Sequence, residues 1–197
     1  MDVSTGGWSI GELSALAAKA ARGAGLPWGI AEEAGHIVRT LCGWDLAAIE
    51  PLVADLACDK PGQSLHLACS ISDGMAFEDV AKETGPVVPL LIAPALSSRL
   101  DDSETLVLRD AAGVAGLHVW SGGAELPKEA GLSTRGPFTL ATSARPMPPT
   151  SPTHSNRVFD VDPVAYDRLA QLAHRTYAPA SARSRETGAG AGLLDND

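Results

Sequence analysis

Residues able to bind an anion gather at the end of the chain, in YAPASARSRETGAGAGLLDND (177–197). Guanidinium groups hold carboxylates and phosphates through paired hydrogen bonds. Successive backbone amides in a glycine-rich segment can form an anion-binding concavity. This composition predicts a carboxylate or phosphate site, and its predicted ligand-binding residues are Ser181, Arg183, Ser184, Arg185, Gly188, Gly190, Gly192, Asp195, Asn196 and Asp197.

The same segment also admits two interpretations without a ligand. Chain ends are commonly flexible, so an acidic flexible tail is one of them. In the other, Arg183 or Arg185 pairs with Asp195, Asp197 or the terminal carboxylate in a structural clasp. A dinucleotide-binding loop is excluded, because its glycines need a preceding strand and a following helix.

Complete catalytic signatures are absent from the sequence. It contains no Gly-x-Ser-x-Gly elbow and no phosphate-binding GxxxxGK loop. Asp195 and Asp197 are the candidate proton acceptors, on the condition that the tail shields them from water. Whether the protein is an enzyme therefore stays open.

Metal binding has one candidate pair, His66 and Cys69, with Cys58 eight residues before the histidine. No CxxC and no HxxxH element accompanies them. A buried cysteine usually serves as a small apolar side chain. We therefore predict no metal site and no cofactor.

Composition narrows the class of protein. Of 197 residues, 45% are hydrophobic and 20% charged, which is typical of a globular domain, and the formal net charge is −9. That charge disfavours nucleic acid and anionic membranes as partners. Three widely spaced cysteines, the lack of a leader pattern and a longest apolar run of ten residues (VVPLLIAPAL) favour a cytoplasmic protein without a membrane span.

Helix signals dominate the first part of the chain. Ser9 and Glu12 have capping-box spacing, and Gly23 or Gly25 can end the helix that they start. A second helix is predicted from Pro27 to Gly43, and a third around Pro51. Small residues on the inward faces of the first two predict a closely packed antiparallel hairpin.

Strand signals follow. We predict strands in 64–72 and in the proline-bounded stretch 86–100, and a hairpin formed by 104–110 and 114–122 around the turn DAAG. Further strands are predicted in 137–144 and 157–161, and Asp162 followed by Pro163 predicts the start of a last helix.

These elements predict an α+β fold with an N-terminal helical hairpin, a mainly antiparallel β-sheet, a C-terminal helix and a glycine-rich tail. We expect a single domain, 1–197. Its parts are a helical lobe (9–58), a β-rich region (64–145), a surface connector (146–156) and a final strand, helix and tail (157–197).

Three stretches resemble a known family: AKAARGAG (18–25), WGIAEEAG (28–35) and the ending YAPAS…SR…GAGAGLLDND. They are similar to the uncharacterised bacterial proteins grouped as domain of unknown function 3726. The resemblance brings no activity with it. It implies that the tail is a family feature, ordered rather than flexible.

Two functions remain open at this point. In the first, the protein binds or acts on a small anionic metabolite, a carboxylate or phosphate, through its C-terminal tail. In the second, it is a non-catalytic accessory subunit or a dimeric scaffold, a homo-oligomer or heteromer whose tail docks at a protein interface.

Overall fold

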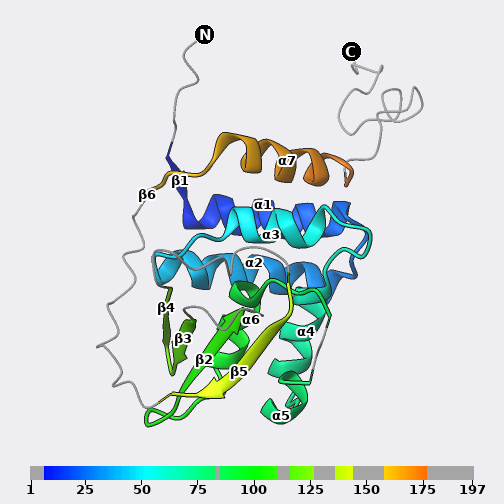
Figure 1. Ribbon diagram of the computed structural model, residues 1–197. Coiled ribbons are helices and arrows are strands. Elements are labelled where there is room, and N and C mark those ends of the chain that lie inside the picture. The colour runs from blue at the N-terminus through cyan, green and yellow to red at the C-terminus, as the bar shows by residue number, and fades with distance from the viewer. Residues whose placement is uncertain (1–6, 83–84, 111–115, 127–135, 144–157, 177–197) are drawn as a thin grey trace, which may run out of the picture.

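The computed structural model describes residues 7–82, 85–110, 116–126, 136–143 and 158–176 (Figure 1). Helices α1, α2, α3 and α7 lie together at one end of the molecule, while α4, α5, α6 and a four-stranded sheet form the other end. The expected α+β class is confirmed.

The helices are α1 (Ile10–Gly23), α2 (Trp28–Gly43), α3 (Ile49–Leu56), α4 (Gln63–Ser72), α5 (Phe77–Val80), α6 (Pro89–Ser97) and α7 (Pro163–His174). The strands are β1 (Trp8–Ser9), β2 (Thr105–Asp110), β3 (Leu117–Trp120), β4 (Gly123–Glu125), β5 (Phe138–Thr142) and β6 (Val158–Phe159).

The predicted helical hairpin is confirmed in α1 and α2. The Ser9 hydroxyl accepts the Glu12 amide at 3.2 Å, and the Glu12 carboxylate accepts the Ser9 amide at 2.9 Å, which completes the capping box. Gly25 takes the left-handed φ of 93° that turns the chain toward α2. The helices approach closely, because a Cβ on Gly35 would lie 2.9 Å from the Ser14 carbonyl oxygen.

Helix α7 begins where the sequence predicts. The Asp162 carboxylate accepts the amides of Val164 and Ala165, both at 3.3 Å, as an N-cap. The helix buries Leu169 and Leu172 against α1 and α3 and runs beside α1 in the same direction (Figure 1). Strand β6, predicted within 157–161, pairs with β1. This pairing brings the start of α7 close to the start of α1.

Two predicted strands are wrong, because 64–72 is helix α4 and most of 86–100 is helix α6. In α4 the buried residues Leu65, Ala68 and Ile71 recur at helical spacing. Every residue of α6 is buried, so no polar face marks its period, and a short apolar run then fits a helix or a strand equally well. Pro89 stands in the first turn, where its missing N–H costs nothing. The β-rich part therefore begins at Thr105 instead of 64.

The main sheet has the order β4-β3-β2-β5 with every neighbour antiparallel. The predicted hairpin is confirmed, with Thr105 opposite Trp120 and Leu108 opposite Leu117. Ser97 at the end of α6 ties the helix to this sheet. Its hydroxyl donates to the Trp120 carbonyl at 2.7 Å and accepts the Gly122 amide at 3.0 Å.

A buried carboxylate joins the two ends of the molecule. Asp55 of α3 has no solvent exposure, and its Oδ1 accepts the Ser64 amide at 3.1 Å and the Ser64 hydroxyl at 2.7 Å. The Ser64 oxygen in turn accepts the Val88 amide at 2.8 Å, directly before α6. Asp55 therefore accepts hydrogen bonds from the first turn of α4, and through Ser64 it links α3, α4 and the start of α6.

We predict that Asp55→Ala lowers the free energy of unfolding by about 3 kcal/mol, because buried donors on Ser64 lose their acceptor. Urea unfolding followed by circular dichroism measures the change. The exposed neighbour Asp59 supplies the control, since Asp59→Ala should stay within about 0.5 kcal/mol of the parent protein. Equal stabilities for Asp55→Ala and Asp59→Ala would contradict the assigned role.

Candidate functional site

The predicted anion site of the tail lies outside the described residues, as does the connector 146–156. None of Ser181, Arg183, Ser184, Arg185, Gly188, Gly190, Gly192, Asp195, Asn196 and Asp197 is among the residues that the structure describes. The description ends at Thr176, just after α7. Thr176, the last described residue, belongs to the surface formed by the ends of α1 and α7.

That surface contains a cavity of about 410 Å³ where α1 ends, α2 begins and α7 ends. We call it the cationic cavity. Its lining residues are Ala18, Lys19, Arg22, Trp28, Ala31, Glu32, Arg175 and Thr176. Three of these side chains are cationic and one is a carboxylate, so the lining is positive in a chain whose formal charge is −9.

One glycine lets the three helix ends meet. A Cβ on Gly23 would lie 1.7 Å from the Leu172 carbonyl oxygen, a distance that no side chain can occupy. The last turn of α1 therefore packs directly on the backbone of α7. This contact places Lys19 and Arg22 beside Arg175, although the two arginines are far apart in sequence.

Arg22 is held in place by two contacts. Its guanidinium donates to the Leu26 carbonyl and lies over the Trp28 ring, 4.5 Å from the ring centroid. A guanidinium has five N–H donors in a planar fork, so this hydrogen bond leaves most of them for other acceptors. Trp28 itself is 69% exposed, unusual for so large an apolar side chain.

Helix dipoles explain part of this arrangement. Basic residues in the last turns of α1 and α7 are favoured by the negative ends of those helices. The dipoles do not explain why the residues converge on one cavity. The N-terminus of α2, the positive end of its dipole, also lies at the cavity. Pro27 there supplies no side-chain cap for the first backbone amides of α2. This site is not among those predicted from the sequence, where its one signal is the spacing of Lys19 and Arg22, three apart near a helix end.

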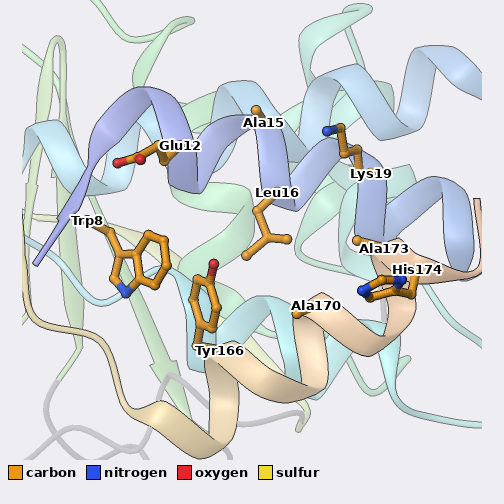
Figure 2. A pocket seen from close by; sticks show the side chains of 9 residues that line it. All are labelled: Trp8, Glu12, Ala15, Leu16, Lys19, Tyr166, Ala170, Ala173 and His174. Carbon is orange, nitrogen blue, oxygen red and sulfur yellow. The ribbon is translucent and has the colours of Figure 1, made fainter. Parts of the chain in front are cut away.

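A second hollow adjoins the first along α1. This α1–α7 groove has a volume of about 320 Å³ and shares Lys19 with the cationic cavity. Figure 2 shows Trp8 and Tyr166 at one end and Lys19 and His174 at the other. The Trp8 and Tyr166 rings are stacked, with centroids 4.1 Å apart and planes at 17°. Burial, and then the nearby charges of Glu12 and Asp167, raise the pKa of Tyr166, so its hydroxyl is a proton donor at neutral pH.

The His66 and Cys69 pair lies in a third hollow, between α2 and α4, with a volume of about 540 Å³. Cys58 is elsewhere, with its thiol near the carbonyl oxygens of Asp55 and Lys60. Within the described parts of the chain, no three histidine, cysteine, aspartate or glutamate residues are grouped so that they could hold a metal ion. Burial, followed by the charges of Glu33 and Asp73, raises the pKa of Cys69 to about 11. The thiol is therefore a poor nucleophile at neutral pH.

We predict slow alkylation of Cys69 in the folded protein. With a pKa of about 11, its thiolate fraction at pH 7.5 is about two orders of magnitude below that of an ordinary cysteine. Iodoacetamide labelling read by peptide mass spectrometry measures the rate, with the urea-unfolded chain as the control. Equal rates in the folded and unfolded chains would contradict the assignment.

We also predict that Gly23→Ala destabilises the protein by about 1–3 kcal/mol and separates the ends of α1 and α7, because the new methyl group overlaps the Leu172 carbonyl. Gly29→Ala is the matched control, since a Cβ at Gly29 meets nothing within 4 Å and alanine favours a helix. Thermal unfolding of both variants tests the difference. A Gly23→Ala protein as stable as Gly29→Ala would show that the close approach is not required.

A family model matches the N-terminal part of the chain, which contains part of this site. Residues 8–84 match the family model described as "Protein of unknown function (DUF3726)". This confirms the resemblance over the N-terminal region, which supplies Lys19, Arg22 and Trp28; α7 and the chain ending lie outside the match. No curated protein and no solved structure matches the chain. The family brings no assigned activity. Separately, no helix within the described ranges has the length and apolar character that crossing a bilayer requires.

Proposed function

We propose that this protein binds a small anionic metabolite, a carboxylate or a phosphate, in the cationic cavity. The observation that carries the proposal is the convergence of Lys19, Arg22 and Arg175 around one hollow of about 410 Å³. A chain with a formal charge of −9 repels anions on average, so it needs such a local cluster to hold one.

The chemistry of the three cations suits such a ligand. Arg22 is already oriented by Leu26 and Trp28, which reduces the entropy that binding would cost. Lys19 and Arg175 are exposed and add point charge and a second guanidinium fork. Glu32 sits on the same lining and disfavours a ligand that carries negative charge on that side.

The sequence of the tail suggests that it contributes further ligands for the anion. It follows Thr176, which lines the cavity, and it carries Arg183 and Arg185. An extended chain covers roughly 3.3–3.6 Å per residue, so the tail is long enough for both guanidiniums to reach the same ligand. Asp195 and Asp197 stay candidate proton acceptors in this proposal, and binding does not depend on them.

A second candidate is the accessory subunit or dimeric scaffold. The exposed Trp28 favours it, because exposed tryptophans often anchor protein interfaces. The two candidates differ in what Trp28 does. In the scaffold, Trp28→Ala breaks an association that light scattering detects, whereas in the metabolite-binding protein the oligomeric state does not change.

We predict that Lys19→Gln and Arg175→Gln each weaken binding of inorganic phosphate by about tenfold or more, since each removes a charge-assisted hydrogen bond. Isothermal titration calorimetry at low salt measures the affinity. Arg168→Gln is the matched control, because Arg168 is an exposed arginine of α7 that does not line the cavity. An undiminished affinity in the Lys19→Gln/Arg175→Gln double variant, or an equal loss in Arg168→Gln, would refute the proposal.

Deletion of 188–197 tests the part played by the tail. A loss of phosphate binding in the shortened chain supports a tail that contributes ligands. Full affinity would restrict the site to the cationic cavity and would remove Gly188, Gly190, Gly192, Asp195, Asn196 and Asp197 from it.

A further inference from the structure

The two hollows that share Lys19 differ in their chemistry. The lining of the cationic cavity carries net positive charge, while the α1–α7 groove is lined mainly by apolar side chains. Lys19 lines both, so a ligand anchored by its anion at Lys19 has the groove directly beside it. The shared lysine allows the ligand class to be specified more closely than by its charge alone.

The groove is shaped for a flat or slender apolar group. Leu16 supplies its floor, and Ala15, Ala170 and Ala173 leave space where larger side chains would fill it (Figure 2). Tyr166 closes the far end and is fixed in orientation by its stack on Trp8. Such an arrangement, apolar walls with a few oriented polar groups, is typical of small-molecule sites.

Charge at the far end of the groove sets a limit on the ligand. Glu12 lines that end, and its carboxylate accepts hydrogen bonds from the Ser9 amide at 2.9 Å and the Ser9 hydroxyl at 2.8 Å. These bonds lower the pKa of Glu12, so it is ionised at neutral pH. This carboxylate would repel a second negative group at the far end of the ligand, whereas it would not repel an uncharged end.

We infer that the ligand is an anion with a single acidic head and an aromatic or apolar body, the head at Lys19, Arg22 and Arg175 and the body in the α1–α7 groove. This inference rests on the proposed function. It excludes dicarboxylates whose two acidic groups stand at opposite ends of a chain that spans the groove. It also gives the stacked pair Trp8 and Tyr166 a role in selecting the ligand.

The test compares three probes on the full-length protein by calorimetry: acetate, 3-phenylpropionate and suberate, a dicarboxylate of similar length. We expect 3-phenylpropionate to bind about tenfold or more tightly than acetate, because its ring leaves water for the groove, and more tightly than suberate. Ala170→Leu, which fills the groove, should remove this advantage and leave acetate binding unchanged. Gln171→Leu, at the exposed neighbouring position, should keep it.

A second variant guards against a folding defect in Ala170→Leu. Leu16→Ala removes the apolar floor without adding bulk and should reduce the 3-phenylpropionate advantage while acetate affinity stays the same. Equal affinities for acetate and 3-phenylpropionate, or tighter binding of suberate, would overturn the inference and leave the proposed anion site standing. Binding of 3-phenylpropionate that is insensitive to Lys19→Gln/Arg175→Gln would overturn the proposed function. Failure of all three probes to bind would overturn the inference, and failure of inorganic phosphate to bind as well would overturn the proposed function.

Discussion

The buried carboxylate of Asp55 is the constraint on which the rest of the arrangement depends. A polar group without access to water must be satisfied by protein partners, and here two donors come from the first turn of α4. Because Ser64 also accepts the amide that precedes α6, the position of α6 follows from the same group. The sheet is attached to α6 through Ser97. One carboxylate thus sets the relation between the helical end of the molecule and the strands.

The candidate site forms where the ends of three helices meet. Three helix termini meet at one place because Gly23 allows backbone contact between α1 and α7 and Gly25 turns the chain into α2. Basic residues are favoured at two of these termini for reasons that concern the helices alone. Their convergence turns a local preference into a positive hollow, which Thr176 also lines.

Local signals in the sequence were sufficient wherever a capping side chain or a proline marked a boundary. Ser9, Pro27 and Asp162 each identify a helix start, and the turn DAAG between two strand-like stretches identifies a hairpin. The same reasoning failed for α6, where complete burial removes the contrast that reveals a period. The cationic cavity could not be predicted, because Arg175 approaches Lys19 only through the packing of α7 on α1, a long-range contact that spacing does not encode.

The docking of α7 has a thermodynamic consequence. This helix packs on α1 and α3 and contributes one wall to each of the two adjoining hollows. Any molecule that bridges α1 and α7 must therefore favour the docked helix over the detached one, and by linkage a firmly docked helix must favour that molecule. Slower amide hydrogen exchange in α7 would report occupancy, because exchange of its amides requires the helix to open or detach.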